Sequence, residues 1–519
     1  MRLHVRTDPS HARRWLIDLR DRLQRDGYIC DFIAGPVTPE PSAVGLLFQL
    51  ESLIYRRRGP LPSDPIDWDE LKRCNSGGSQ PPDLVIDLAA APAACCQTSP
   101  RLVVLYDGQA GLPALLAPVL EGRMSTVSVA DAATGAIVVD GVPGTDNAET
   151  VSQAMEFALA RVVTLIAGAV ARYPNGAVPA GEATKARPTP AVSSPAALSF
   201  LMRAIAFSAV RRLYKLCYYA PHWRIGWRFI GDGAPGVYET LSLDGAQWNI
   251  LPDPGVRFFA DPFPISVHGR HYIFFEDLDH RAPKGVISYV EVDRAGGVSP
   301  VRRALEEPWH LSYPFLFEDD GQIWMIPESS ANRTIDLYRA DPFPQRWTKV
   351  ATLLSDVEAS DATVVRHNGR LWMFAATRDG QGSFSDTLSL FSAPRLTGPW
   401  TPHPANPVLV DQRAARPAGG FFMRDDRLWR PVQDCERGYG TGIGLAEVAR
   451  LDETAFEQRV HTVLRTPLGW TGRRLHTLTR YGQLECIDGS AHSPKIPALF
   501  GTLDRPLRKR SRVAPFVDR

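Results

Sequence analysis

The chain has 519 residues, too many for one ordinary hydrophobic core, so we expect about two to four domains. Its 58 Lys and Arg nearly balance its 57 Asp and Glu. With this balance, nothing in the overall charge argues for a nucleic-acid groove or a polybasic membrane patch. The composition therefore predicts a neutral or locally charged partner.

The seven cysteines are scattered, odd in number and without any C-x-x-C pair. This pattern favours reduced thiols over a disulfide framework or a zinc site, and we expect no metal and no cofactor. The first residues, Met1 to Asp8, are polar and show no secretory signal. The most apolar run, Val162 to Ala171, has about half the length of a bilayer span and predicts a buried helix. We expect a cytoplasmic protein without a transmembrane span.

Residues 1–172 alternate between strand-like and helix-like stretches. The pattern predicts strands at Leu3–Arg6, Ile29–Ala34, Leu84–Leu88 and Leu102–Tyr106, and helices at Pro9–Asp26 and Ala43–Tyr55. Compact apolar runs of this kind lie inside parallel sheets. We therefore predict a Rossmann-like α/β domain over residues 1–172.

Residues 173–195 are rich in Pro, Ala, Gly, Ser and Thr and are typical of a linker. Residues 196–222 then predict a connecting helix with interspersed Arg and Lys. Such a basic amphipathic helix is compatible with peripheral contact to a membrane surface. More often, a helix like this packs on the next domain with its charges in solvent. Residues 496–519 form a basic tail.

A short phrase recurs in the second half of the chain at a spacing of roughly fifty residues, a spacing typical of propeller blades. Its copies are Asp261–Glu276, Tyr313–Glu328, Asp361–Ala376, Ala418–Gln433 and His476–Gly489. Each copy reads as two apolar strands joined by a polar turn, most clearly at Asp320-Gly321 and Asn368-Gly369. We predict an all-β five-bladed propeller over residues 223–495, with an open all-β sandwich as the alternative.

Blades of a propeller place equivalent residues around one central funnel, so site residues are expected to recur in register. The first repeat position carries Asp261, Tyr313, Asp361, Ala418 and His476, and the second strands end at Glu276, Glu328, Ala376 and Gln433-Asp434. Paired carboxylates are what glycosidic chemistry needs, one protonated and one ionised. The alternative is structural, since an acid at a strand end can simply bond to backbone.

Further polar residues around the repeats suit the recognition of a sugar by stacking and by bidentate hydrogen bonds. They are His310 and Tyr313 near the second copy, Arg416, Arg430, Gln433 and Tyr439 in and after the fourth copy, and Glu276 and His476 elsewhere. Arg416 could equally pair with a structural Asp.

At these residues the second half resembles the five-bladed propeller superfamily of arabinanases, β-xylosidases and invertases. It resembles even more closely the N-terminal domain of glucosamine inositolphosphorylceramide transferases. The motifs are Phe259-Ala-Asp-Pro-Phe263, Tyr313-Pro-Phe-Leu-Phe317, Ile326-Pro-Glu-Ser329, Ser360-Asp-Ala-Thr363, Arg416-Pro-Ala-Gly419, Arg430-Pro-Val-Gln-Asp434, His476-Thr477 and Ile487-Asp-Gly489.

The resemblance to the hydrolases implies three acidic roles. Asp261 matches the base or nucleophile that opens the first blade, and Asp361 matches the acid of the third blade that tunes acidity. The general acid that opens the fourth blade has no match, because Arg416 stands there; Glu328 or Asp434 could replace it. A calcium ion in the central channel is an analogy only. In the plant transferases the transfer chemistry is attributed to a separate domain, so the resemblance implies no transferase activity.

The first domain resembles a formyltransferase-like α/β fold. The Asn, His and Asp catalytic set of that family is not recognisable between Leu102 and Asp131, where Tyr106-Asp107-Gly108 stands. The resemblance therefore implies a degenerate domain with a structural or regulatory role.

Two functions remain open from the sequence. One is a carbohydrate-active protein, glycoside-hydrolase-like or glycosyl-transferring, that acts on a sugar or glycoconjugate in glycan assembly. The other is a non-catalytic glycan-binding or scaffold module of a polysaccharide or glycolipid system. The sequence leaves open which sugar is bound and the oligomeric state.

Overall fold

The computed structural model describes residues 1–37, 42–55, 60–73, 75–76, 80–89, 99–145, 148, 150–173, 194–231, 233–467, 470 and 472–496. The chain divides into two compact units, Met1–Ala209 with Asp379–Ser383, and Val210–Arg378 with Phe384–Arg519. Most of the predicted linker and of the predicted basic tail falls outside the described residues.

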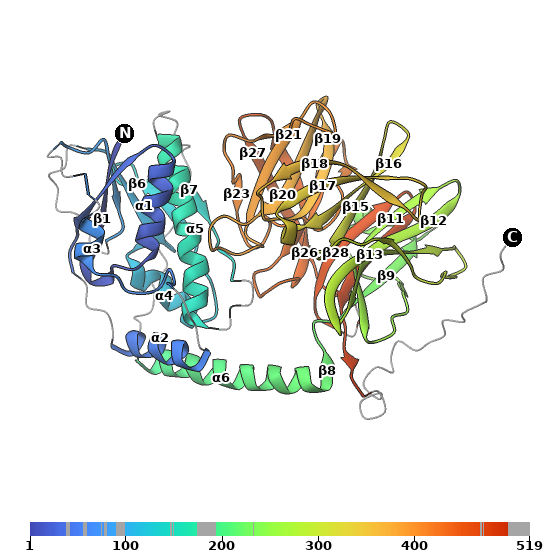
Figure 1. Ribbon diagram of the computed structural model, residues 1–519, viewed down its shortest axis with the longest axis horizontal. Helices are drawn as coiled ribbons and strands as arrows, with labels where there is room; N and C mark the ends of the chain where they lie inside the picture. The colour runs from blue at the N-terminus through green and yellow to red at the C-terminus, as the bar shows by residue number, and fades with distance from the viewer. Residues whose placement is uncertain are drawn as a thin grey trace. The chain divides into compact units, whose positions relative to one another are not determined.

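Unit 1 contains a mixed sheet accompanied by helices (Figure 1). Its strand order is β2 (Ile29–Ala34), β1 (Arg2–Thr7), β3 (Leu84–Asp87), β4 (Arg101–Tyr106), β6 (Val127–Asp131) and β7 (Ile137–Gly141), with β5 (Gln109–Ala110) beside β4. The first four strands are parallel, whereas β6 runs antiparallel to both β4 and β7. The predicted α/β composition is confirmed; the Rossmann-like assignment stays a prediction.

The helices of unit 1 are α1 (Trp15–Arg25), α2 (Ser42–Tyr55), α3 (Trp68–Lys72), α4 (Leu112–Leu120) and α5 (Val151–Arg172). By length and composition α5 could cross a membrane, but most of it is buried inside the protein, as the apolar run from Val162 predicted. Its first turn is fixed by Glu51, whose carboxylate accepts hydrogen bonds from the N–H groups of Val151 and Ser152. An anion at this end also complements the helix dipole.

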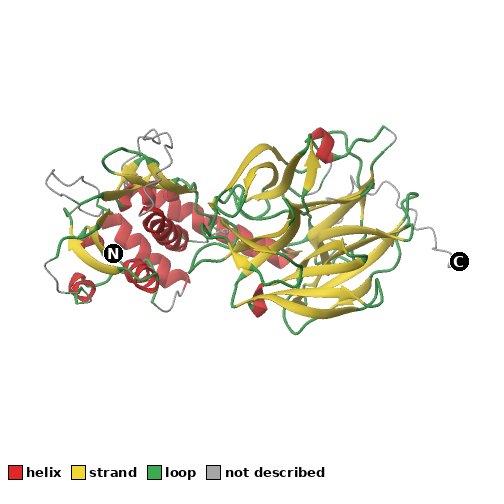
Figure 2. Cartoon of the chain, turned by 90° about the horizontal axis from the view of Figure 1, so that it is seen from above, coloured by secondary structure: helices red, strands yellow, loops and turns green. Residues whose placement is uncertain are grey.

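Unit 2 is built almost entirely of strands (Figure 2). They form five sheets of four or five strands each and a separate two-stranded sheet of β8 (Tyr218–Tyr219) and β30 (Ser493–Pro494). The five larger sheets are the ones described next. The first four are β11 (Arg257–Val267), β12 (Arg270–Asp279), β13 (Ala282–Val292) and β14 (Arg302–Leu305); β15 (Ser312–Asp319), β16 (Gln322–Ser329), β17 (Thr334–Ala340) and β18 (Trp347–Ser355); β19 (Ala359–His367), β20 (Arg370–Thr377), β21 (Thr387–Ala393), β22 (Thr401–Pro402) and β23 (Leu409–Val410); and β24 (Phe422–Arg424), β25 (Arg427–Asp434), β26 (Gly442–Leu451) and β27 (Phe456–Leu464). Each sheet is one blade, and the five-bladed propeller is confirmed.

The fifth blade is assembled from both ends of the propeller. Among the strands of the blades, its inner strands β28 (Leu475–Tyr481) and β29 (Leu484–Ser490) come last in sequence, and its outer strands β9 (Trp223–Phe229) and β10 (Asn249–Ile250) come first. Strands β29 and β9 pair over seven residues, from Leu484 opposite Phe229 to Ser490 opposite Trp223. This pairing closes the ring and completes the short fifth repeat.

Each repeat is a tight hairpin with the predicted turn chemistry. The two turn residues both have positive φ at His268-Gly269, Asp320-Gly321, Asn368-Gly369 and Asp425-Asp426. This is the backbone of the type I′ turn, which matches the twist of antiparallel strands and selects Gly, Asn and Asp. The repeated aromatic residue, three positions after the second turn residue, then packs into the core: Tyr272, Trp372 and Trp429 are buried and Trp324 is partly buried.

Candidate functional site

The inner strands share an irregularity at the first repeat position. Strands β11, β15 and β19 each carry a break in pairing register there, and the residue at the break has positive φ: 51° for Asp261, 40° for Tyr313 and 56° for Asp361. Positive φ is uncommon for residues other than Gly and is a genuine outlier for one as bulky as Tyr. Bulges of this kind re-aim side chains and are common beside functional sites.

Asp261 is buried and held by groups from neighbouring blades. Its Oδ1 accepts a hydrogen bond from Thr477 Oγ1 at 2.7 Å and lies 3.1 Å from His476 Nε2, while its Oδ2 accepts from Tyr313 N at 3.3 Å. Burial opposes ionisation, but the positive charge of His476 and these hydrogen bonds together hold the pKa of Asp261 below its usual value. Asp261 is therefore an ionised carboxylate at neutral pH.

His476 lies between two carboxylates. Besides Asp261, Asp488 faces it, with Oδ1 2.9 Å from His476 Nδ1, an ion pair whose direction is poor for a hydrogen bond. Burial disfavours the imidazolium, but Asp488 and Asp261 outweigh burial and raise the pKa of His476 to about 10. Asp488 also accepts from the N–H groups of Asp261 and Thr477. The histidine is consequently a buried cation that balances part of the acidic charge.

Asp361 is bound by the fourth blade. Arg416 Nε donates to its Oδ2 at 2.5 Å, Arg416 Nη2 donates to its Oδ1 at 3.4 Å, and Gln433 Nε2 donates to Oδ2 at 3.0 Å. Arg416 also lies over the ring of Tyr439, 4.9 Å from its centre. Arg416, which opens the fourth blade, is thus a cation whose guanidinium is bound to the carboxylate of Asp361 in the third blade.

Glu328 completes this half of the site. Its Oε2 lies 3.7 Å from Arg416 Nη2, and its carboxyl is hydrogen-bonded to Asp361. Burial and the negative charge of Asp361 raise the pKa of Glu328 to about 8, although Arg416 opposes the shift. Burial also raises the pKa of Asp361. Glu328 is therefore a protonated acid at neutral pH that shares its proton with a neighbouring carboxylate.

Glu276 is a second neutral acid, from the first blade. Its Oε1 lies 3.3 Å from Nε2 of His310, whose Nδ1 accepts a hydrogen bond from Gly285 N at 2.9 Å. Since Nδ1 accepts, the proton of the neutral imidazole is on Nε2 and points to Glu276. Burial, together with the charge of Asp261, raises the pKa of Glu276 well above its usual value, and burial lowers that of His310.

Three other candidates lie in supporting positions. The Tyr313 side chain is fully buried, with its hydroxyl 2.9 Å from Thr363 Oγ1. Arg430 donates to the carbonyls of Ala414 and Ala415 and so fixes the segment that precedes Arg416; burial lowers its pKa to about 9. Asp434 forms an ion pair with Arg465 at 2.8 Å.

Sequence reasoning brought together Asp261, Asp361, Glu328 and Arg416 but missed Asp488 as a site residue. Asp488 lies one position before Gly489, the residue that matches Glu276 and Glu328 in pairing register. Because Asp488 is one residue out of that register, the repeat pattern does not mark it as a site residue. The available signal was the Ile487-Asp-Gly489 motif itself.

Asp261, His476 and Asp488 each offer an oxygen or nitrogen atom within 4.8 Å of the others, a spacing that could hold a metal ion. The chemistry of the set fits a metal poorly, however. A ligating histidine must be deprotonated, whereas both ring nitrogens of His476 face carboxylates and its pKa is raised to about 10. The imidazolium itself supplies the positive charge there.

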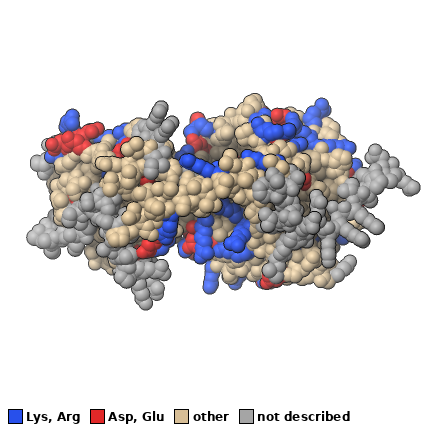
Figure 3. Space-filling view, turned by 90° about the horizontal axis from the view of Figure 1, so that it is seen from below, with Lys and Arg blue, Asp and Glu red and all other residues tan. Residues whose placement is uncertain are grey.

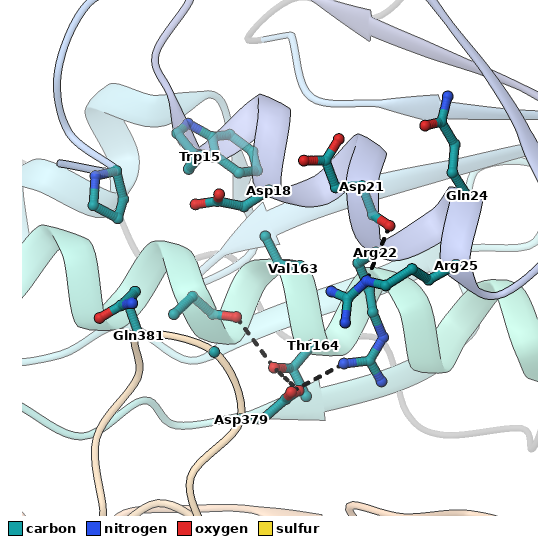
Figure 4. Close-up of a pocket in the computed structure, with 13 residues that line it drawn as sticks. Trp15, Asp18, Asp21, Arg22, Gln24, Arg25, Val163, Thr164, Asp379 and Gln381 are labelled. Atoms are coloured by element: carbon teal, nitrogen blue, oxygen red, sulfur yellow. Dashed lines mark hydrogen bonds and ion pairs between the residues drawn. The ribbon is translucent and has the colours of Figure 1, made fainter. Parts of the chain in front are cut away.

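Unit 1 contains a pocket of about 760 Å³ lined by α1, α5 and residues 379–381 (Figure 4). Its charged side chains bind one another: Arg22 Nη1 lies 2.9 Å from Asp379 Oδ1, and Thr164 donates to Asp379 Oδ2 at 2.8 Å. Asp18 also lines the pocket, and burial raises its pKa. The larger set of buried carboxyl groups with shifted pKa values lies in the propeller, and we place the candidate site there.

The fold and this site define a five-bladed β-propeller whose inner strands gather ionised and protonated carboxyl groups beside two buried cations. Residues 252–487 match the family model described as glucosamine inositolphosphorylceramide transferase 1, N-terminal. The predicted resemblance to that domain is confirmed.

Curated relatives match the same half of the chain. Glucosamine inositolphosphorylceramide transferase 1 of Arabidopsis thaliana is 31% identical over 259 residues, which are 48% of this chain and 33% of that protein. Its counterpart from Oryza sativa subsp. japonica is 31% identical over 230 residues, 42% of this chain and 31% of that protein. The chain thus spans about a third of the length of these relatives.

Solved structures with low similarity scores include glycoside hydrolases. A family 117 glycoside hydrolase from Zobellia galactanivorans has a TM-score of 0.34 and 13% identity, covering 54% of this chain and 98% of that chain. An exo-β-1,3-galactanase from Phanerochaete chrysosporium has a TM-score of 0.32 and 14% identity, covering 42% of this chain and 58% of that chain.

Proposed function

We propose that the propeller is a carbohydrate-active domain that acts on a sugar or glycoconjugate, either by glycoside hydrolysis or by glycosyl transfer. The observation that carries the proposal is the division of protonation states within one cluster. Asp261 is held ionised, and Glu328 is held protonated with a pKa of about 8. Environments that push carboxyl pKa values apart in this way assign an acid and a base.

In this proposal Asp261 is the base or nucleophile, and Glu328 protonates the leaving oxygen. Asp361 and Arg416 tune the acidity of Glu328, because both contact its carboxyl group. Glu276 and His310 donate to or accept from sugar hydroxyls, and the Tyr439 ring offers a stacking face beside Arg416. The name shared by the curated relatives supports a glycoconjugate as the substrate class.

A screen of aryl and alkyl glycosides tests the roles of the two acids. We expect Asp261→Asn to lose activity by about 10²–10⁴-fold on every substrate. Glu328→Gln should lose as much on alkyl glycosides but little on nitrophenyl glycosides, because a good leaving group needs no proton. Asp425→Asn, at an exposed turn, is the matched control and should retain parental rates.

The same screen decides between the two candidates for the acid. If Asp434→Asn instead shows the loss that depends on the leaving group, the acid role belongs to Asp434. Equal rates for Asp261→Asn and the parent would end the proposed role of Asp261. The parent rate should also fall as pH rises through about 8, since Glu328 then loses its proton.

The alternative is a non-catalytic glycan-binding module, and one observation favours it. Arg416 stands where the fourth blade of the hydrolases carries its acid, and its guanidinium is committed to Asp361. A sugar that binds by calorimetry to the parent and to Glu328→Gln alike, without turnover in either, would establish this function in place of catalysis.

We also propose that residues 1–172 form a degenerate formyltransferase-like domain with a structural or regulatory role, and that the protein acts in the cytoplasm. Asp107, in the region where the family's catalytic set is missing, is bound by Arg123 at 2.6 Å and by Thr126 N at 2.9 Å. An assay with a formyl-folate donor should give no product, and fluorescence microscopy of a tagged chain tests the location.

A further inference from the structure

Helix α6 (Ser194–Cys217) presents large apolar side chains to solvent. Of seventeen exposed large hydrophobic residues in the described part of the chain, seven belong to this helix: Leu198, Met202, Ile205, Phe207, Val210, Leu213 and Leu216, between 41% and 73% exposed. Single exposed apolar residues are normal, whereas a contiguous patch marks an interaction surface. The concentration of exposed apolar side chains on α6 therefore indicates that a binding partner covers this helix.

Five of these seven residues form a continuous stripe along the helix, whereas Phe207 and Val210 lie further round it. Leu198, Met202, Ile205, Leu213 and Leu216 follow one another at intervals of three, four or eight residues, so at 3.6 residues per turn they share one face. Ala209, which is also exposed, fills the gap between Ile205 and Leu213 on that face. The stripe runs for about five turns.

The charges of α6 have one sign. The helix contains Arg203, Arg211, Arg212 and Lys215 and no Asp or Glu. Arg212, which is exposed, borders the apolar stripe, and Lys215 and Arg211 follow further round the helix on the same side. Arg203 lies on the far side of the helix, where its guanidinium donates to Leu120 O. Viewed from below, the surface along α6 is mainly uncharged, and Lys and Arg together with some Asp and Glu of other segments lie beside it (Figure 3). An apolar stripe whose own helix carries only cationic charges complements a bilayer surface that carries anionic lipids.

The C-terminal end of α6 is fixed to the propeller by its other side. The Tyr214 hydroxyl lies 2.7 Å from His492 Nδ1, and the backbone of Lys495 donates to Cys217 O at 2.9 Å. Strand β8 (Tyr218–Tyr219), which follows α6 directly, pairs with β30 (Ser493–Pro494). Tyr214 lies nearly opposite Leu216 around the helix, so at this end of α6 these contacts leave Leu216 turned away from the propeller.

A second basic segment starts at the same place. The chain leaves the propeller at Lys495, beside the end of α6, and its sequence then continues with Arg505, Arg508, Lys509, Arg510 and Arg512. We propose that α6 lies in the interface of an anionic membrane, with its apolar stripe among the acyl chains and its Arg and Lys at the lipid phosphates. Membrane binding through α6 would hold the propeller close to a lipid-linked sugar. That consequence rests on the proposed function, whereas membrane binding itself does not require catalytic activity.

Flotation of the full-length protein with lipid vesicles tests the proposal. We expect the parent to float with vesicles of phosphatidylcholine containing about one third phosphatidylglycerol, and much less with phosphatidylcholine alone. High salt should weaken binding to the anionic vesicles, because exposed charges are screened. Failure of the parent to float with anionic vesicles would overturn the proposal.

Matched variants identify the surface. Leu213→Ser with Leu216→Ser should abolish flotation, and Arg212→Glu with Lys215→Glu should weaken it at least about tenfold on anionic vesicles. Val350→Ser, Met423→Ser and Arg395→Glu alter exposed residues of the propeller and should float like the parent. Parental flotation of the Leu213/Leu216 variant would overturn the proposal. So would a lipid-free dimer, detected by light scattering, that the same two substitutions dissociate.

Discussion

At the scale of single residues, the candidate site is a balance of buried charges. Asp261 and Asp488 are compensated by His476, and the proton-sharing pair of Asp361 and Glu328 is compensated by Arg416. Removing one partner from such a set leaves an uncompensated buried charge, which costs about 3–5 kcal/mol. The site therefore depends on charges that stabilise each other across blades far apart in sequence.

Stability should fall with rising pH because of His476. Its pKa is raised from 6.5 to about 10, so its contribution is fully present below about pH 6.5 and is lost as pH rises through 10. Between these limits the folded state holds one extra proton, and the free energy of unfolding should fall by about 1.4 kcal/mol per pH unit. Glu328, raised to about 8, adds a loss of the same sign between about pH 4.5 and 8.

Urea unfolding between pH 9 and 9.5 isolates the histidine, because Glu328, with a pKa of about 8, has by then lost most of its proton. The His476→Gln variant should be less stable and should lack this slope, while His461→Gln, on the exposed side of β27, should keep it. A slope that survives in His476→Gln would assign the extra proton to another group.

At the scale of elements, the hairpins of the repeats could be predicted from the sequence, whereas the strands that close the ring could not. The turns Asp320-Gly321 and Asn368-Gly369 can be recognised in the sequence, because few residue types accept the positive φ angles that both turn positions require. Strands β9 and β10 carry no copy of the repeat. Strand β10 pairs only with β9, and the other partner of β9 is β29, more than 200 residues later, so the local pattern gives no signal for this half of the blade. Asp261 and Asp361 were found by register; the roles of Asp488 and Arg416 depend on contacts between blades, which no single repeat encodes.

A close approach between the fourth and fifth blades makes Gly419 irreplaceable. At its φ of 143°, a Cβ atom would lie 1.9 Å from Leu478 O on β28, whose N–H donates to Ala418 O at 2.8 Å. Gly419→Ala should cost about 3 kcal/mol by overpacking and lost pairing. Gly482→Ala, at a turn with positive φ and open space, should cost only about 1–2 kcal/mol. If thermal unfolding shows the same loss of stability for both variants, the backbone between Gly419 and Leu478 can move apart enough to accommodate a Cβ atom.

At the scale of the whole molecule, stability should depend on the seam between β9 and β29. Trp227 is 1% exposed, lies opposite Cys486 in this pairing and packs with Phe259 and Phe275 of the first blade. Trp227→Ala should cost about 3–5 kcal/mol and raise hydrogen exchange in all five blades, because the ring opens as a unit. Trp248→Ala, at a partly buried position, is the control. Faster exchange confined to the fifth blade would show that the blades unfold independently.

The order in which a ribosome delivers this chain gives the seam a consequence for quality control. Asp261 is synthesised more than 200 residues before His476 and Asp488, which are carried by β28 and β29, the last two blade strands in chain order. Until the β28–β29 hairpin has been synthesised, the nascent propeller has an unpaired strand edge, and Asp261 lacks the positive charge of its counter-ion. A prematurely terminated product would keep both defects, and proteases and chaperones would recognise it before it could compete with the finished protein.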